Sequence, residues 1–192
     1  MKRWTREEVQ GLADRLVGQL ERWHVEQNRG QLARLRRGLS GATQRDAWPV
    51  LGRLFGELAV DHPVFETVAG CFALYPLENA PPVGNFGETM RRTVPEEKMR
   101  DEKEPHTRFR RLLACDDQDA ICQHIRHAVR LAKSSKDSAV NYRQLFLDLW
   151  WWNDRTKVEW AKAYWNVPID VTDFALAGVG APVEEEPAPM PE

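Results

Sequence analysis

The stretch LFLDLWWWNDR, from Leu145 to Arg155, places three consecutive tryptophans near the C-terminal end of the chain. Successive residues of an α-helix lie about 100° apart, so three neighbours cannot share one face. The segment is therefore predicted to be covered on more than one side, at a corner where two helices meet. Helical spacing continues the stripe of Leu145 and Leu149 to Trp152, which we expect in the core.

Trp150 and Trp151 are the other members of this run. Trp150 lies one turn after Phe146 and can share a second apolar stripe with it, whereas Trp151 points toward the side of Leu147. We expect one of these two tryptophans to be partly exposed in the isolated chain, beside Arg155. Two interpretations of the exposed ring stay open. The pattern favours a packed helix corner over a surface that stacks on a base or meets a partner.

Helix-start signals flank this segment and recur along the chain. Asn141–Gln144 and Thr156–Glu159 have the spacing of a capping box, as does Thr5–Glu8 near the N-terminus. No run alternates with the period of two that is typical of a strand. The sequence therefore predicts an all-α fold, a single compact domain of about eight helices. We expect helices at residues 5–28, 32–39, 46–58, 61–75, 106–114, 117–132, 141–152 and 156–164, with one or two turns at 86–92.

Charge is divided unevenly along the chain. Residues 170–192 hold six acidic side chains and no basic one, so the 27 basic and 29 acidic residues of the chain become 27 and 23 in residues 1–169. A Pro-rich, acidic segment cannot bury enough apolar surface to order itself. We therefore predict a helical domain at residues 1–168 and a disordered tail at residues 169–192.

The composition also bears on the compartment. The three cysteines, Cys71, Cys115 and Cys122, are an odd number, and no apolar run is long enough to span a membrane. The chain starts with a helix signal and not with an apolar signal segment. These features favour a reducing, cytoplasmic compartment and no membrane partner.

A metal site is the first alternative that the residue types raise. Cysteine and histidine cluster at Cys115, Cys122, His124 and His127. Their spacing lacks the close cysteine pair that is typical of zinc sites, and free cysteines are often buried for packing alone. The interpretation without metal is therefore favoured, and no cofactor is expected.

A small nuclease is the second alternative. Asp116, Asp117 and Asp119 could together hold Mg²⁺, yet acids in a first helical turn more often cap the helix and oppose its dipole. No nucleophile elbow, P-loop or HExxH motif is present. We therefore expect a non-catalytic protein.

Clusters of arginine are the most informative feature of the sequence. The planar fork of arginine binds two phosphate oxygens, which suits a surface that follows a sugar–phosphate backbone without reading bases. Arg126, Arg130 and Lys133 are spaced to line one helix face. The other interpretation, surface ion pairs with acidic residues, stays open. The candidate nucleic-acid-binding residues are Arg36, Arg37, Arg108, Arg110, Arg111, Arg126, Arg130, Lys133, Arg155 and Lys157.

Four segments together resemble a known family. They are LARLRRG (residues 32–38), FGETMRR (86–92), RFRRLLACDDQDAICQHIRHAVRLAK (108–133) and NYRQLFLDLWWWNDRTKVEWAKAYW (141–165). Their order and spacing resemble the CasB family over most of residues 30–166. This family is the small subunit of Cascade, the type I-E CRISPR surveillance complex.

The resemblance implies an all-helical, non-catalytic subunit in antiviral defence. It implies two copies lying end to end along the guide RNA–target DNA hybrid, with the backbone and large subunits of Cascade as further partners. There the chain would support the target strand and the displaced strand and so stabilise the R-loop. A protein–protein scaffold subunit without nucleic-acid contact is the alternative. The family's basic positions match Arg36, Arg37, Arg108, Arg126 and Arg155, with Arg130 one turn further.

Overall fold

The computed structural model of the 192-residue chain describes residues 3–76, 84–99, 106–135 and 138–166. Within these residues there are ten α-helices, two short 3-10 helices and no strand, which confirms the predicted all-α fold. None of the described helices is both long and apolar enough to cross a membrane. The tail predicted at residues 169–192 lies outside the described residues.

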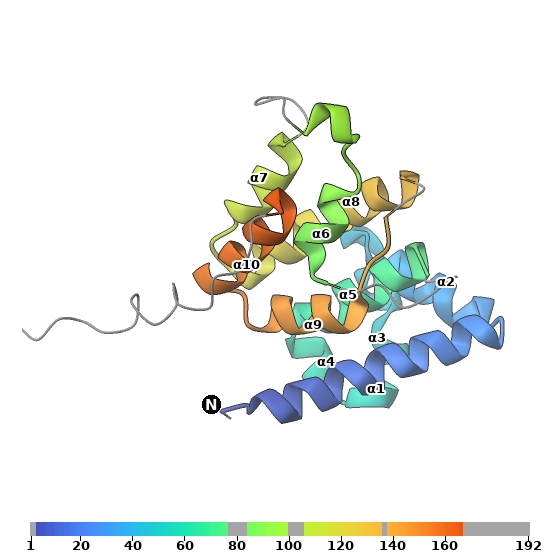
Figure 1. The fold of residues 1–192 in the computed structure, drawn as a ribbon. Coiled ribbons are helices and arrows are strands. Elements are labelled where there is room, and N and C mark those ends of the chain that lie inside the picture. The colour runs from blue at the N-terminus through green and yellow to red at the C-terminus, as the bar shows by residue number, and fades with distance from the viewer. Residues whose placement is uncertain (1–2, 77–83, 100–105, 136–137, 167–192) are drawn as a thin grey trace, which may run out of the picture.

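The helices follow one another through short connections (Figure 1). In chain order they are α1 (Arg6–Val25), α2 (Arg29–Gly38), η1 (Gly41–Asp46), α3 (Trp48–Phe55), α4 (Leu58–Asp61), α5 (Pro63–Leu74), α6 (Phe86–Arg91), η2 (Glu96–Lys98), α7 (Thr107–Leu113), α8 (Gln118–Ser134), α9 (Tyr142–Trp150) and α10 (Asp154–Trp165). The count exceeds the predicted eight because α4 forms where the helices expected at residues 46–58 and 61–75 adjoin, and because the turns at 86–92 form α6.

The division between α3 and α4 lies at Gly56. This residue takes a φ of +64°, in the left-handed region that glycine adopts without the steric cost of a side chain. Its N–H donates to the carbonyl of Gly52 and closes α3. The apolar periodicity runs on from Leu54 to Leu58 across the break, and for this reason the sequence pattern predicts one continuous helix.

Side-chain caps fix where several helices begin. Thr5 and Glu8 form the predicted capping box of α1, in which each side chain accepts from the backbone N–H of the other. Asn141 caps α9 by accepting from the N–H of Gln144 at 3.1 Å. The Gln144 side chain donates to Asp148 instead, so the second half of that predicted box is replaced by a contact within α9.

The predicted start of the last helix at Thr156 is wrong by three residues. The N-cap of α10 is Asn153, whose side chain accepts from the backbone N–H of Thr156 at 3.1 Å. The Thr156 hydroxyl donates to the carbonyl of Trp151 at 3.0 Å and so ties the first turn of α10 to the end of α9. Asparagine and threonine both cap helices well, so the sequence is compatible with a helix that starts after Asn153 or after Thr156.

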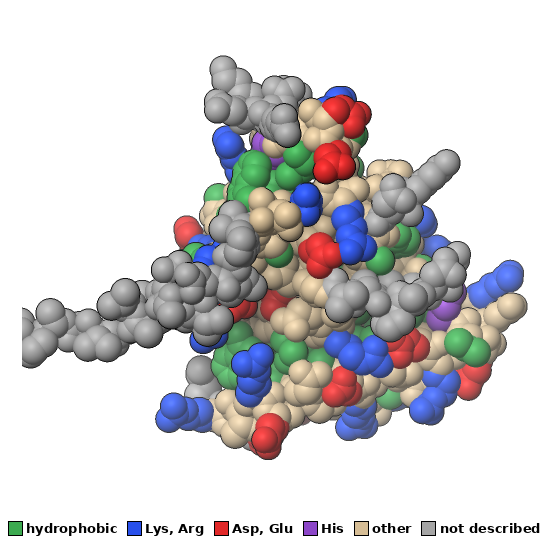
Figure 2. Space-filling model, in the orientation of Figure 1, with side chains coloured by type: hydrophobic (Ala, Val, Ile, Leu, Met, Phe, Trp, Pro, Cys, Tyr) green, Lys and Arg blue, Asp and Glu red, His purple; other side chains and the backbone are tan. Residues whose placement is uncertain are grey.

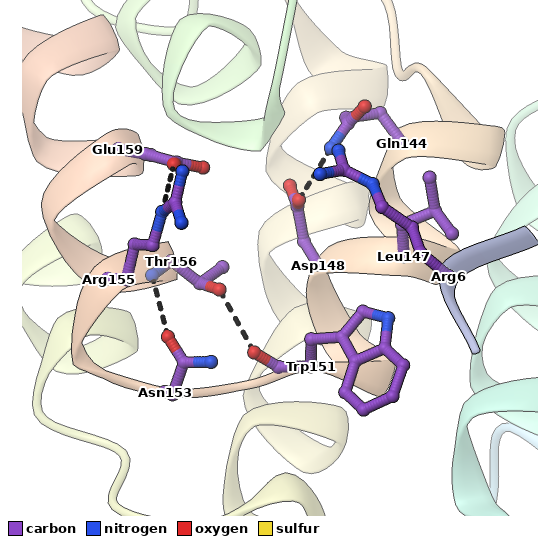
Figure 3. Close-up of a pocket in the computed structure, with 9 residues that line it drawn as sticks. All are labelled: Arg6, Gln144, Leu147, Asp148, Trp151, Asn153, Arg155, Thr156 and Glu159. Carbon is purple, nitrogen blue, oxygen red and sulfur yellow. Dashed lines mark hydrogen bonds and ion pairs between the residues drawn. The ribbon is translucent and has the colours of Figure 1, made fainter. Parts of the chain in front are cut away.

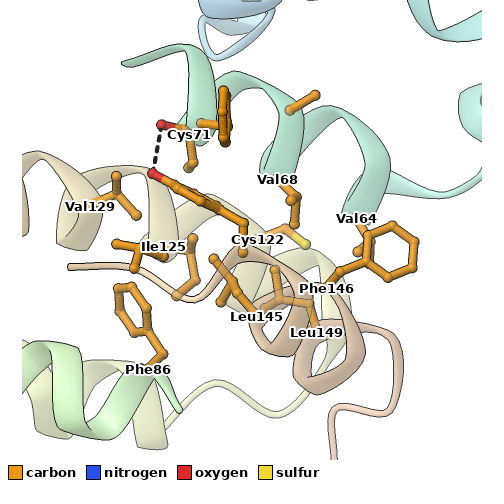
Figure 4. Packing of buried hydrophobic residues seen from close by; sticks show 14 of the residues in the cluster. Val64, Val68, Cys71, Phe86, Cys122, Ile125, Val129, Leu145, Phe146 and Leu149 are labelled. Atoms are coloured by element: carbon orange, nitrogen blue, oxygen red, sulfur yellow. Dashed lines mark hydrogen bonds between the residues drawn. The ribbon is translucent and has the colours of Figure 1, made fainter. Parts of the chain in front are cut away.

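Helix α5 forms the centre of the core. Its residues from Val64 to Ala73 are all buried, because α2, α8 and α9 pack around it. Gly70 lets α2 approach closely, since a Cβ there would lie 2.6 Å from the side chain of Leu39. Figure 4 shows how α5, α6, α8 and α9 contribute to this core through Val64, Val68, Cys71, Phe86, Cys122, Ile125, Val129, Leu145, Phe146 and Leu149.

Helices α6, α7 and α10 lie together beside this centre (Figure 1), and aromatic contacts join them. The ring centroids of Phe86 and Trp160 lie 5.3 Å apart, and Phe109 stacks on Tyr164 with centroids 3.9 Å apart. Gly87 lies at the closest approach of α6 to α10, where a Cβ would be 2.0 Å from the carbonyl oxygen of Trp160. These contacts join α10 to α6 and α7, and both α6 and α7 pack against α8.

The tryptophan run at the junction of α9 and α10 is packed on two sides, as predicted. Trp150 is buried and stacks on Phe146, with ring centroids 5.7 Å apart. Trp152 is partly buried, and its indole N–H donates to the carbonyl of Cys115 at 2.9 Å. Trp151 is 40% exposed, which confirms that one of Trp150 and Trp151 is open to solvent.

Candidate nucleic-acid interface

The exposed faces of α7 and α8 border a groove of about 550 Å³. We call it the α7–α8 groove. Arg108 and Arg111 line it from α7, and His124, His127 and Arg130 line it from α8. Between these basic residues the lining is apolar, from Leu112, Ala128 and Leu131.

Helical spacing explains why these side chains gather. Arg108 and Arg111 are three residues apart and share one face of α7, while Phe109 turns the other face into the core. The groove residues of α8 lie away from its buried stripe, which includes Ile125 and Val129. Packing of the two apolar faces against the core therefore leaves the two basic faces next to each other.

The groove carries positive charge without a carboxylate to offset it. No aspartate or glutamate lines it. In the described part of the chain, no ion pair joins Arg108, Arg111 or Arg130 to an acidic residue. Guanidinium groups stay protonated at physiological pH, so a phosphate backbone is a ligand that matches this groove in charge and in hydrogen-bonding geometry.

Helix α1 shows the opposite pattern. In Figure 2, basic and acidic side chains alternate along the lower edge of the molecule, where α1 lies. Arg143 of α9 pairs across this edge with Asp14 at 3.2 Å and with Glu21 at 2.7 Å. Mixed charges of this kind are typical of a solvated helix face. The α7–α8 groove therefore differs from α1 in its lack of acids.

Arg126 lies on α8 but does not line the groove. Its guanidinium donates to the carbonyl of Leu39 at 3.1 Å and lies 3.5 Å from a carboxylate oxygen of Glu66, with 16% of its side chain exposed. Burial raises the pKa of Glu66, and a hydrogen bond from Gln44 and the charge of Arg126 act against this rise. Arg126 thus joins α8 to α2 and α5. A separate hollow, which Asp119 also lines, touches both Arg126 and Arg130.

Lys133 and the arginines of α2 also lie outside the groove. Lys133 donates from Nζ to the carbonyl of Leu74 at 3.0 Å, at the C-terminal end of α5. Arg37 lies 3.3 Å from Asp46, and its neighbour Arg36 is exposed. These residues keep exposed charge, but the fold places none of them beside Arg108.

The remaining predicted residues lie on or near α10. Arg110 does not line the groove, and its charge acts on Tyr164, whose pKa burial raises to about 12. Arg155 is exposed and pairs with Glu159 at 3.1 Å. Lys157 is mostly covered and lies within 4 Å of two acids, Asp116 at 3.7 Å and Asp154 at 3.5 Å.

The residues of the metal alternative are separated by the fold. Cys115 and Cys122 are buried, and burial raises the pKa of the Cys122 thiol to about 12, which disfavours the metal-binding thiolate. His124 and His127 face the groove instead. The described residues contain no group of three or more side chains placed to hold a metal ion.

The acidic cluster has the capping geometry. The side chain of Asp117 is the N-cap of α8 and accepts from the N–H of Ala120 at 2.8 Å. Asp116 faces Lys157, and Asp119 lines a different hollow beside Arg126. The three carboxylates therefore point to three different surroundings, which does not match a shared Mg²⁺ site.

Two groove residues, His124 and His127, entered the sequence analysis only as metal candidates. The missed signal is their spacing from Arg130, because residues 124, 127 and 130 succeed one another at intervals of three on one helix. Alignment with Arg108 and Arg111 of α7 is a tertiary feature that no spacing within α8 predicts.

The described residues thus define an all-α protein with a basic surface groove. A family model for CRISPR-associated protein Cse2 (CRISPR_cse2) matches residues 31–165, from α2 to the end of α10. The chain therefore belongs to the Cse2 family, also called CasB, whose members are the small, non-catalytic subunit of type I-E Cascade. This confirms the resemblance found in the sequence. No curated protein and no solved structure matches the chain.

Proposed function

We propose that this chain supports the guide RNA–target DNA hybrid and the displaced strand within Cascade by binding phosphates in the α7–α8 groove. Membership of the Cse2 family supports a place in this assembly. Contacts to phosphate carry no sequence information, so the support is independent of the target sequence. The subunit is non-catalytic in this proposal, and its partners are the backbone and large subunits and a second copy of itself.

The observation that carries the proposal is the absence of acids among the groove residues, between Arg108, Arg111 and Arg130. Each phosphate that such a groove neutralises releases condensed counterions, which favours binding at low salt. R-loop formation is close to energetic balance, so a few contacts of this kind are enough to shift the equilibrium toward the open target.

The test is the triple variant Arg108→Ala, Arg111→Ala and Arg130→Ala in the assembled complex. We expect weaker R-loop formation on every target sequence. The slope of log affinity against log salt should become less steep, by about 0.9 for each duplex phosphate contact that is lost. Affinity would be measured by filter binding over a salt series on two unrelated targets.

The matched control removes three exposed arginines elsewhere, Arg22, Arg29 and Arg53. Both triple variants change the net charge by the same amount. A smaller slope in the groove variant alone would therefore reflect lost phosphate contacts and not lost net charge. If the groove variant assembles normally and keeps the affinity and slope of the unchanged complex, the proposal fails. The chain would then be better described as a protein–protein scaffold.

A further inference from the structure

A further hollow, of about 300 Å³, lies where α9, α10 and the start of α1 meet (Figure 3). We call it the Trp151 pocket. Trp151 and Arg6 border it on one side, Arg155 and Glu159 border it on the other, and Asp148 lies between them. This position separates it from the α7–α8 groove.

The backbone that carries the exposed indole of Trp151 is fixed by its surroundings. The carbonyl of Trp151 accepts from the Thr156 hydroxyl at 3.0 Å, which fixes the backbone at the end of α9. The neighbouring Trp150 packs against Trp4 at a centroid distance of 5.6 Å, and this contact anchors the chain just before Arg6. The ring of Trp151 is thus open to solvent in a pocket that Arg6 and Arg155 also line.

Charge in the Trp151 pocket is balanced. Arg155 lies 3.1 Å from Glu159, and the charge of Arg6 acts on Asp148. Two cations and two anions sum to zero, so the pocket itself does not attract a phosphate. A flat group that is neutral and able to form hydrogen bonds matches it better.

The floor of the pocket offers hydrogen-bond acceptors. Asp148 is 6% exposed, and its two carboxylate oxygens accept from the Gln144 side chain at 2.7 Å and from the Trp160 indole at 2.6 Å. Each of these oxygens can accept a further hydrogen bond. An apolar side chain of a partner protein would cover these acceptors without bonding them, whereas a base with an exocyclic amino group can donate to one.

We propose that the Trp151 pocket binds one nucleobase of a single strand, which stacks on Trp151 and donates to Asp148. Arg6 and Arg155 border the pocket on opposite sides, and each lies near an acid, so the flat base and not a phosphate is the group that the pocket holds. Stacking on an aromatic ring accepts every base, because each base has a flat π-face. The proposal rests on the proposed function in one respect, that Cascade brings a single strand to this chain. It does not require the α7–α8 groove.

The test compares binding of the full-length chain to oligocytidylate strands of about ten nucleotides and to abasic strands of the same length. Fluorescence anisotropy at low salt gives both affinities. We expect the base-bearing strand to bind more tightly. Trp151→Ala should weaken its binding on the order of 10-fold and abolish the difference from the abasic strand. Trp151→Phe should keep most of the difference.

The matched control is Trp165→Ala, which removes another tryptophan that is 41% exposed but lies at the far end of α10. This variant should bind both strands like the unchanged chain. DNA and RNA versions of the strand separate the two sources of a base, the displaced strand and the guide. A preference for DNA or for RNA supports the pocket and identifies the strand that supplies the base.

Two results would overturn the proposal. One is equal binding of base-bearing and abasic strands by the unchanged chain. The other is a Trp151→Ala variant that keeps the difference between the strands. If this variant also fails to enter Cascade, Trp151 contacts a protein instead. The groove triple variant should weaken both strands by the same factor. If it weakens neither while Trp151→Ala acts as expected, only the groove proposal fails.

Discussion

Arg126 and Arg130 lie one helical turn apart on α8 and border one hollow, but Arg130 is exposed and Arg126 is mostly covered. Arg130 opens into the α7–α8 groove, whereas Arg126 turns toward Leu39 and Glu66. Spacing within α8 predicts that both residues lie near the same face, and both are arginines in the sequence. The difference comes from Glu66, which is 60 positions earlier in the chain and is buried in α5.

Arg126→Ala is expected to destabilise the fold by about 1–3 kcal/mol, because it leaves the buried Glu66 carboxylate and the Leu39 carbonyl without their partner. Arg130→Ala, on an exposed position of the same helix, should change the free energy of unfolding by less than about 0.5 kcal/mol. Urea denaturation at neutral pH measures both. Equal effects of the two variants would contradict the structural role of Arg126.

Asp148 is expected to make the fold less stable as the pH rises from about 4 to about 6. Burial raises its pKa from 3.8 to about 6, so in this range the folded chain keeps a proton that the unfolded chain has released. The stabilisation is therefore complete below the lower value and lost above the higher one. A shift of this size corresponds to about 3 kcal/mol at most.

The other carboxylates also titrate in this range, so the measurement is a difference. Urea denaturation of the unchanged chain and of Asp148→Asn would be compared from about pH 4 to pH 7. The neutral amide mimics the protonated acid, so the stability of the unchanged chain relative to the variant should fall with rising pH. A difference that stays constant with pH would show that Asp148 titrates normally.

At the scale of the helix, the contact of α6 with α10 depends on the missing side chain of Gly87. A Cβ there would lie 2.0 Å from a backbone carbonyl, and a backbone atom cannot rotate away as a side chain can. Gly87→Ala is therefore expected to destabilise the fold by about 1–3 kcal/mol. A Cβ at Gly11 in α1 would have no atom within 4 Å, so Gly11→Ala should stabilise the fold by about 0.5–1 kcal/mol.

Thermal unfolding of the two variants checks this pair. The melting temperature should fall for Gly87→Ala and rise for Gly11→Ala, although both changes add the same methyl group to a helix. A rise for both would mean that helix propensity outweighs the contact and that α6 can move away from α10. The pair thus separates packing between helices from the preference of a single helix.

Most helices could be predicted from the sequence because their caps and apolar stripes are local. Thr5 with Glu8, and Asp117 before α8, cap the helices that their spacing predicts. The start of α10 could not be predicted, because Asn153 and Thr156 are both good caps and the choice depends on the contact of Thr156 with Trp151. The α7–α8 groove could not be predicted from the sequence either, because it depends on how two helices pack beside each other.

At the scale of the whole molecule, α10 lies between the two candidate surfaces. Lys157 lies 3.7 Å from Asp116 in the connection from α7 to α8, and Arg155 of the same helix borders the Trp151 pocket. The groove residues come from the two helices that this connection joins. A strand that leaves the groove along α10 would therefore pass toward the Trp151 pocket.

The charge of the whole chain acts on both surfaces. Residues 167–192 contain six acidic and no basic side chains, so a chain ending at Asn166 has 27 basic and 23 acidic residues and a formal net charge of +4 in place of −2. We expect this shortened chain to bind duplex and single-stranded DNA more tightly at low salt, with faster association, because the net repulsion is removed. Surface plasmon resonance over a salt series measures both.

A full-length variant with the six acids replaced by their amides is the control that separates charge from chain length. If charge is the cause, this variant and the shortened chain should bind alike. Their advantage over the unchanged chain should disappear near 1 M salt, where the screening length falls to about 3 Å. A shortened chain that binds more tightly than the amide variant at every salt concentration would contradict this. In that case the residues after Asn166 would oppose binding by occupying space, and salt could not relieve the effect.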